Sequence, residues 1–235
     1  MQKTEQDNRV QKLVSLLGSE GTSEFTVGSA SVSSLAERFG TPFYVYSGDV
    51  ILRQINRLRN ALGDDTDIYF SLKANPSLGV CQLIAAQGLG AEVASVGELL
   101  LSQKAGFPAE KTIFAGPGKT NEELELATRL GIFSVNVESE GEMARLGEIA
   151  SRAGKVLGAG IRINPAFQVK GAQMRMGGGP QQFGIDAERV EQAIARFSEN
   201  PYLRILGPHV FVGTQMFDVE AIASHFRHVV ELAQM

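Results

Sequence analysis

Residues 67–106 read DIYFSLKANPSLGVCQLIAAQGLGAEVASVGELLLSQKAG, and short apolar segments alternate here with longer segments of helical periodicity. The alternation predicts strands at Ile68–Leu72 and Ala91–Ala94, and helices at Leu78–Ala86 and Val96–Lys104. Glycine and proline stand at the joints between these elements, where the chain has to turn. A strand, a helix and a second strand at this spacing are typical of a βαβ unit with parallel strands.

The same alternation continues to the end of the chain. Further strands are expected at Ile113–Ala115, Phe133–Val137, Ala159–Ile163 and Ile205–Val212. The helices that follow them are expected at Asn121–Leu130, Glu140–Ala153, Ala187–Phe197 and Val219–Leu232. These roughly six strand–helix units fit an open doubly wound α/β sheet or a (β/α)8 barrel, and both place their sites beyond the carboxyl ends of the strands. A barrel needs eight units, so a barrel would be incomplete in these 235 residues.

The residues before this pattern differ in character. Residues 1–30 are polar and rich in serine and glycine, and they suggest a short helix or an arm, then a strand near Phe25–Val27. A second apolar run, Phe43–Tyr46, predicts another strand, and Ser47 can cap a helix that ends near Leu62. We therefore expect an arm and strand segment in residues 1–46 and an α/β domain in residues 47–235.

The composition argues against several classes of partner. The net charge of −4 lacks the basic excess of proteins that bind nucleic acids or acidic membranes. No apolar run approaches the roughly 20 residues of a membrane helix. Residues 1–12 show no apolar signal segment, so we expect a cytoplasmic protein. Cys81 is the only cysteine, which rules out a disulfide within the chain, and we expect it in the core.

Lys73 is the first candidate for chemistry. It ends an apolar strand, and a lysine at the end of a barrel strand can point into the mouth, where its amine can attack an aldehyde. From the residue type alone, a surface lysine that merely ends a strand fits as well. The three histidines show no metal-ligand spacing with acids or Cys81, so no metal site is expected.

Two glycine-rich segments imitate phosphate loops. Residues 116–120, Gly-Pro-Gly-Lys-Thr, end like a P-loop, but Ile113 stands where that motif begins with glycine. We expect them to line the end of the third strand instead. Gly177–Gly179 lie in a long loop, Phe167–Gln182, after the fifth strand. A loop of this length is either a contact for a substrate or partner, or a connector.

The segment Tyr69–Pro76 resembles the cofactor-lysine motif of the fold-type III pyridoxal 5'-phosphate (PLP) decarboxylases, which include the diaminopimelate, ornithine and arginine decarboxylases. Further segments resemble motifs of this family in the same order: Gly40–Tyr46, Ala91–Leu99, Arg162–Pro165, Phe183–Ile185 and Gly207–Gln215. The resemblance begins near residue 34. It implies a barrel of the alanine racemase type, with the strand near residue 45 belonging to a separate β-domain.

The resemblance also implies roles for matching residues. Lys73 is implied as the lysine that forms a Schiff base with PLP, with Ser71 beside it in the cofactor site. Glu92 stands where the family has an acidic residue near the lysine and the cofactor ring, more commonly an aspartate. Arg162 resembles an arginine of the cofactor pocket. Thr214 falls where the family often has a serine that binds the cofactor phosphate.

Three positions leave alternatives open. Phe211 stands where many members stack a histidine on the cofactor ring, and phenylalanine can stack but cannot transfer a proton. His209, two residues earlier on the same side of the strand, either lines the site or packs. Glu98, one helical turn further than Glu92, either orients neighbouring groups or is a solvated helix residue.

For the whole protein, the resemblance implies decarboxylation of an amino acid and a homodimer. A glycine-rich phosphate loop, a glutamate at the pyridine nitrogen and a cysteine from a second subunit are expected beyond residue 235. This piece alone is therefore expected to be inactive. Met174–Gly179 and Phe211–Gln215 look less like diaminopimelate decarboxylases. They look more like relatives in secondary-metabolite or polysaccharide-linked pathways, some of which act on carrier-bound amino acids.

Three other interpretations remain. Alanine racemase shares the fold type, but its lysine segment continues differently from Asn75-Pro76-Ser77. The small PLP-carrier proteins are single barrels of about this length, but they lack the Phe183–Ile185 segment. A catalytically inactive PLP-binding or regulatory homologue that binds a partner protein is the third. The retained Lys73 argues against it, and Phe211 keeps it open.

Overall fold

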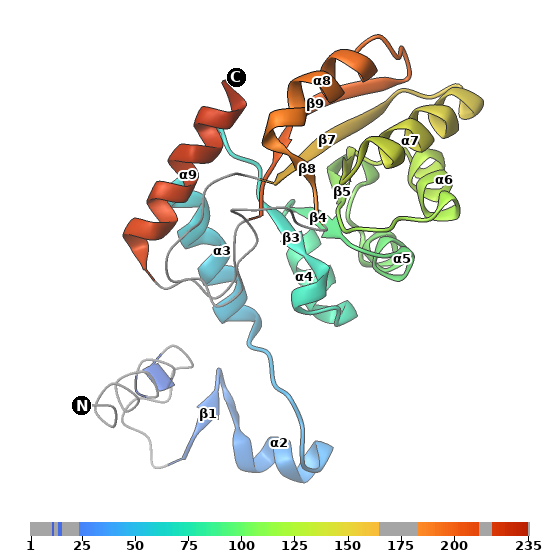
Figure 1. Ribbon diagram of the computed structural model, residues 1–235. Helices are drawn as coiled ribbons and strands as arrows, with labels where there is room; N and C mark the ends of the chain where they lie inside the picture. The colour runs from blue at the N-terminus through green and yellow to red at the C-terminus, as the bar shows by residue number, and fades with distance from the viewer. Residues whose placement is uncertain (1–10, 12–13, 16–23, 165–182, 212–217, 235) are drawn as a thin grey trace. The chain divides into compact units, whose positions relative to one another are not determined.

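The computed structural model describes residues 11, 14–15, 24–164, 183–211 and 218–234. By its internal contacts the chain divides into two compact units, Met1–Ile68 and Tyr69–Met235, which are described separately (Figure 1). The division predicted between residues 46 and 47 concerns a separate β-domain and stays a prediction.

Residues 24–68 of the first unit form a small hairpin followed by two helices. Its elements are β1 (Thr26–Val27), β2 (Ala30–Ser31), α2 (Val32–Phe39) and α3 (Gly48–Leu62), with β1 and β2 antiparallel. Ser47 caps α3 as predicted, because its hydroxyl accepts a hydrogen bond from the backbone N–H of Val50 at 3.4 Å.

The strand predicted at Phe43–Tyr46 does not form, so this prediction is wrong for the chain in this structure. Tyr44 is 91% exposed, and no strand among the described residues pairs with this segment. A strand becomes stable only when its backbone N–H and C=O groups find partners on a neighbouring strand. The apolar pattern of residues 43–46 records the propensity of the segment, but the described residues of this unit supply no such neighbour.

The second unit is built on a parallel sheet. Its main strands are β3 (Tyr69–Ser71), β4 (Gly90–Val93), β5 (Thr112–Phe114), β6 (Ser134–Val137), β7 (Leu157–Asn164) and β9 (Leu203–His209). They pair in chain order, each with the next, and the two-residue strand β8 (Ile185–Asp186) pairs with the end of β7. All six strand–helix units expected from the sequence are present, with boundaries shifted by a few residues.

Helices follow the strands in regular alternation. They are α4 (Leu78–Ala85), α5 (Val96–Ala105), α6 (Asn121–Leu130), α7 (Glu140–Ala153), α8 (Ala187–Phe197) and α9 (Val219–Ala233). Short 3₁₀ turns, η1 (Leu72–Ala74) and η2 (Ala109–Lys111), follow β3 and precede β5. Three of these helices are capped by a hydroxyl side chain, namely that of Ser95, Thr120 or Ser139, which accepts a hydrogen bond from a backbone N–H group of the first turn.

The arrangement of these helices distinguishes between the two folds that the sequence left open, a doubly wound sheet and a barrel. Successive helices from α4 to α8 pack against one another in order, which places them on one face of the sheet (Figure 1). A doubly wound sheet has helices on both faces and a reversal in strand order, whereas a barrel has neither. The second unit therefore has the organisation of a barrel wall, with α/β class as predicted.

The core of this unit lies along its central strands. All eight residues of β7 are buried, and β6 is buried throughout. Gly158 is required there, because a Cβ at this position would lie 2.3 Å from the carbonyl oxygen of Phe133. Cys81 is fully buried in α4, as predicted. Within the described residues, no helix is both long and apolar enough to cross a membrane.

Candidate active site

Lys73 lies at the carboxyl end of the first strand of the sheet. The 3₁₀ turn η1 carries it directly after β3, and 57% of its side chain is exposed. Its Nζ lies 3.4 Å from Oε1 of Glu92, because Glu92 sits on the neighbouring strand β4 in register with Ser71. The Ser71 hydroxyl is buried and has no hydrogen-bond partner in the structure. The structure brings these three residues together at the neighbouring ends of β3 and β4, and their roles in a cofactor site stay predictions.

The ring of Phe211 lies beside both Lys73 and Arg162, which come from distant strands of the sheet. The Nζ of Lys73 and the guanidinium carbon of Arg162 each lie 5.8 Å from the centroid of the Phe211 ring. Arg162 is on β7 and Phe211 follows β9, so residues from the first, fifth and sixth parallel strands meet at one place. A flat ring beside an amine can stack on a planar group that the amine holds.

Arg162 is held by a carboxylate that the sequence motifs did not single out. Its Nη1 donates to Oε1 of Glu138 at 2.7 Å, and both side chains are nearly buried, at 10% and 5% exposure. Glu138 directly follows β6, the strand that neighbours β7. Its position after a buried strand was the available signal, but a glutamate near a helix start is common enough to pass for a solvated residue.

Lys119 is a second lysine at this end of the sheet, and its environment is opposite to that of Lys73. Its Nζ donates to the carbonyl oxygens of Gly116 and Asn136 at 2.8 and 2.7 Å and to Oε1 of Glu142 at 2.6 Å. With 2% of its side chain exposed, all three donors of the ammonium group are used. The P-loop-like segment therefore supplies a structural lysine, whereas Lys73 keeps an accessible amine.

Glu98 and His209 occupy different surroundings. Glu98 accepts a hydrogen bond from the backbone N–H of Ala94 at 2.7 Å, so it braces the chain just beyond β4. His209 pairs in register with Arg162 across β7 and β9, and its Nδ1 is buried without a hydrogen-bond partner in the structure. Burial, followed by the charges of Arg162, Lys119 and Lys73, lowers the pKa of His209 to about 4. The imidazole is therefore neutral at pH 7.

This shift predicts a pH effect on stability. Because the folded pKa of His209 lies below the unfolded value of 6.5, the unfolded chain binds the extra proton between these values. Stability from this group is present above pH 6.5 and is lost as the pH falls towards 4. Lowering the pH from 7 to 4.5 should cost about 2 kcal/mol through this group. Urea unfolding at both pH values should show a smaller loss for His209→Gln, and an equal loss in both proteins would contradict the assignment.

Two predicted site regions lie outside the described residues. Thr214 belongs to residues 212–217, and the loop Phe167–Gln182 belongs to residues 165–182. Their predicted roles as phosphate contact and as substrate or partner contact stay predictions. Among the described residues, no cluster of three or more histidine, cysteine, aspartate or glutamate side chains could hold a metal ion.

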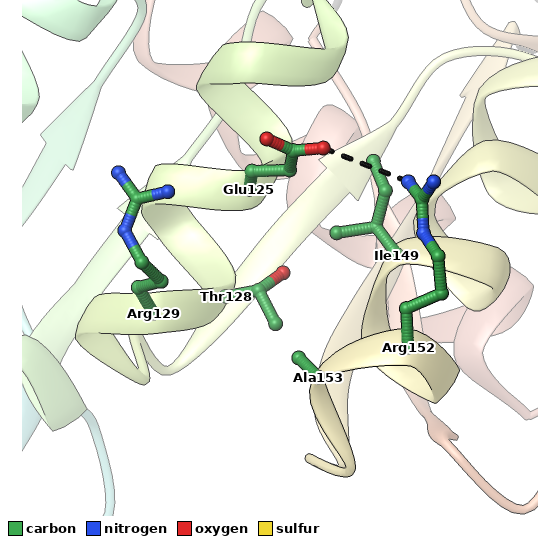
Figure 2. A pocket seen from close by; sticks show the side chains of 6 residues that line it. All are labelled: Glu125, Thr128, Arg129, Ile149, Arg152 and Ala153. Atoms are coloured by element: carbon green, nitrogen blue, oxygen red, sulfur yellow. Dashed lines mark ion pairs between the residues drawn. The ribbon is translucent and has the colours of Figure 1, made fainter.

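A hollow on the second unit lies apart from these residues. Figure 2 shows it between α6 and α7, and its lining residues are Glu125, Thr128, Arg129, Ile149, Arg152 and Ala153. Most of them belong to the last turns of these helices. In βαβ units the helices run antiparallel to the strands, so these ends lie towards the opposite edge of the sheet from Lys73. The hollow is therefore not part of the candidate active site.

The residues at the strand ends fit a PLP cofactor. An accessible amine suits its aldehyde, and the ring of Phe211 suits its pyridine ring. The unpartnered hydroxyl of Ser71 can bind a further polar group. A parallel sheet with its helices on one face and this lysine site defines the class of protein: an α/β protein with a site suited to PLP at the carboxyl ends of its strands.

The chain belongs to the family of pyridoxal-dependent decarboxylases. The family model for their pyridoxal binding domain matches residues 48–235. The family resemblance, the fold class and the PLP cofactor predicted from the sequence are thereby confirmed.

Similar proteins include decarboxylases with different substrates. The L-glutamyl-[BtrI acyl-carrier protein] decarboxylase of Niallia circulans is 38% identical over 205 residues, which cover 87% of this chain and 48% of that protein. The diaminopimelate decarboxylase of Aquifex aeolicus is 35% identical over 210 residues, covering 89% and 50%. The crystal structure of the diaminopimelate decarboxylase from M. jannaschii in complex with L-lysine superposes with a TM-score of 0.82 at 30% identity, covering 90% and 51%. The chain thus spans about half the length of the curated relatives it matches.

Proposed function

We propose that the protein containing this chain decarboxylates an amino acid, with PLP bound through a Schiff base to Lys73. The observation that carries this proposal is the accessible Lys73 amine, which lies 3.4 Å from Glu92 and 5.8 Å from the centroid of the Phe211 ring. When bound, PLP supplies the electron sink that accepts the charge left as CO₂ departs. Family membership supports both the cofactor and the reaction class.

The other residues of the site would position the lysine and the cofactor. The carboxylate of Glu92 neutralises the Lys73 ammonium and holds it near the strand end. The Phe211 ring would cover one face of the cofactor, and Arg162, fixed by Glu138, would bring a positive charge close to it. His209 is neutral and half-buried, so it can donate or accept a hydrogen bond there without adding charge.

We further propose that the substrate is an amino acid carried on a partner protein. The Niallia circulans relative, 38% identical, acts by its name on a glutamyl group attached to an acyl-carrier protein. Diaminopimelate decarboxylases are 31–35% identical over similar lengths, so a free diamino acid is the main alternative. A catalytically inactive homologue is a second candidate function, because Phe211 cannot supply the proton that a histidine could.

The first test is CO₂ release. We expect the 235-residue chain alone to associate, to hold PLP weakly and to release no CO₂. Among the described strands, β3 pairs only with β4, and β9 only with β7, so two sheet edges invite pairing with other chains. Fused to the C-terminal half of the Niallia circulans relative, it should form a dimer and release ¹⁴CO₂.

Four substrates separate the alternatives in this fusion. They are carrier-bound glutamate, free glutamate, diaminopimelate and lysine, each labelled in the carboxyl group. Release from the carrier-bound substrate supports the specific proposal, and release from a free amino acid supports decarboxylation without a carrier. A fusion that binds PLP yet releases CO₂ from none of the four supports the inactive homologue. Turnover by a monomer of the isolated chain would contradict the proposed assembly.

The Phe211 ring predicts an effect on cofactor affinity. Phe211→Ala should weaken PLP binding by about 1–2 kcal/mol, the order of a lost aromatic contact. Phe211→His should retain most of the affinity, because imidazole keeps a flat π-face. Titration of the fusion with PLP, followed by cofactor absorbance, measures the change. The stacking role is wrong if Phe211→Ala binds PLP as tightly as the unchanged protein.

A further inference from the structure

Glu138 stands out because it is buried, charged and directly beside a predicted cofactor residue. Val137 at the end of β6 pairs in register with Ile161 on β7, which brings the next residues, Glu138 and Arg162, level with each other. Their side chains face one another, with Oε1 of Glu138 accepting from Nη1 of Arg162 at 2.7 Å. Only 5% of the Glu138 side chain is exposed.

The backbone of Glu138 is fixed as well as its side chain. Its N–H donates to Oε2 of Glu142 at 3.4 Å, and Oε1 of Glu142 is bound to the ammonium group of Lys119 at 2.6 Å. Lys119 in turn binds the carbonyl oxygen of Asn136, two residues before Glu138. Glu138 therefore contacts the buried Lys119–Glu142 ion pair through its backbone and Arg162 through its side chain.

The position of Arg162 matters to the mouth of the sheet. Its guanidinium carbon lies 5.0 Å from the centroid of the Phe183 ring and 5.8 Å from that of Phe211, which also lies beside Lys73. An arginine side chain has many rotamers and loses considerable entropy when it is fixed. Two weak ring contacts do not select one rotamer, whereas a short charge-assisted hydrogen bond to a buried carboxylate does.

We infer that Glu138 is the positioning residue of Arg162, holding its guanidinium beside Phe211 at the site where Lys73 takes PLP. The inference deepens the proposed function and rests on it for the role of Lys73. Glu138 acts through Arg162. Its second oxygen, Oε2, is buried without a hydrogen-bond partner in the structure, so the tether to Arg162 is its main side-chain interaction.

The first experiment tests the position of Arg162 without any cofactor. The chain is treated with phenylglyoxal, which modifies accessible arginines, and the modified sites are mapped by peptide mass spectrometry. In the unchanged chain Arg162, 10% exposed, should react slowly, whereas exposed Arg189 should react quickly. Glu138→Gln should raise the rate at Arg162 by about tenfold, the factor expected when a hydrogen bond between two charged groups is replaced by a weaker one to a neutral amide.

A matched control lies two residues along the chain. Glu140 pairs with Arg189 and Arg196, and both arginine side chains are largely exposed, at 63% and 66%. Glu140→Gln removes the same charge from the start of the same helix, yet it should leave the reactivity of Arg162 unchanged. Circular dichroism at matched temperature shows that both variants are folded.

The second experiment connects this position to the cofactor. The chain fused to the C-terminal half of the Niallia circulans relative is titrated with PLP and reduced with borohydride, and the label on Lys73 is quantified. Glu138→Gln should raise the half-saturating PLP concentration by about tenfold. Glu140→Gln should not change it. Glu138→Asp keeps the charge and should fall between Glu138→Gln and the unchanged chain in both assays, a graded response that a loss of packing alone would not give.

The outcomes separate the inference from the proposed function. If the unchanged fusion takes no label on Lys73, the proposed function fails, and with it the cofactor part of the inference. If Lys73 is labelled but both Glu138 variants match the unchanged chain in Arg162 reactivity and in PLP titration, the positioning role is overturned. If Glu138→Gln does not fold, the Glu138→Asp comparison decides in the same way.

Discussion

Replacing Lys73 by arginine should abolish covalent attachment of PLP. Arginine keeps the positive charge beside Glu92, so the local ion pair survives, but a guanidinium does not form a stable Schiff base with an aldehyde. Borohydride reduction followed by peptide mapping should place the pyridoxyl label on Lys73 in the unchanged protein and remove it in Lys73→Arg. The expected effect is a loss of all specific label and of the absorbance of the lysine-bound cofactor.

The surroundings of the two strand-end lysines explain why Lys73 and not Lys119 should be labelled. An amine attacks an aldehyde only if it can lose its proton and be reached. Lys73 is 57% exposed and has one carboxylate at 3.4 Å, whereas Lys119 is 2% exposed and binds three acceptors. Lys111→Ala, which changes an exposed lysine bound to the carbonyl oxygen of Gly88, is the control and should keep the label. A label on Lys119, or none on Lys73, would contradict the proposal that Lys73 forms the Schiff base.

Replacing Lys119 by methionine should destabilise the second unit severely. Glu142 would be left buried at 3% side-chain exposure without its counter-charge, and two backbone carbonyls would lose their donor. Breaking a buried ion pair in this way costs about 3–5 kcal/mol. Burial already raises the pKa of Glu142 and lowers the pKa of Lys119, which shows that desolvation opposes both charges. Denaturant unfolding followed by circular dichroism measures the loss.

Two further variants distinguish a lost pair from a lost lysine. Lys119→Met combined with Glu142→Leu removes both charges and should recover part of the stability, because no buried charge then lacks a partner. Lys73→Met removes the exposed strand-end lysine and should change the free energy of unfolding by less than about 1 kcal/mol. Equal losses for Lys73→Met and Lys119→Met would show that the burial of Lys119 does not matter as described.

Sequence patterns predicted most of the fold because βαβ units are local. Helix α8 was predicted at Ala187–Phe197 and has those bounds, since its periodicity and flanking residues lie within the segment. The strand predicted at Phe43–Tyr46 was wrong because strand formation is not local. A strand depends on a neighbour that can be far away in the sequence, and apolar residues in a row do not show whether that neighbour is there.

The candidate site shows the same division. Motif resemblance singled out Ser71, Lys73 and Glu92, and these residues lie close together because consecutive parallel strands place their carboxyl ends side by side. It missed Glu138, because the value of that glutamate lies in its contact with Arg162 on the next strand. It also treated Lys119 as part of a loop lining the mouth, without its ion pair.

The sequence by itself determined the alternation of strands and helices, the caps that begin α5, α6 and α7, and the lysine motif after the first strand of the sheet. These features depend on residues that are close together in the sequence, so a short segment is enough to predict them. Only the tertiary structure decided that the helices cover one face of the sheet and that Lys119 is locked while Lys73 is accessible. It also paired Arg162 with Glu138 across 24 residues. Burial and charge pairing are properties of residues brought together from different strands, and they decide which of two similar lysines can react.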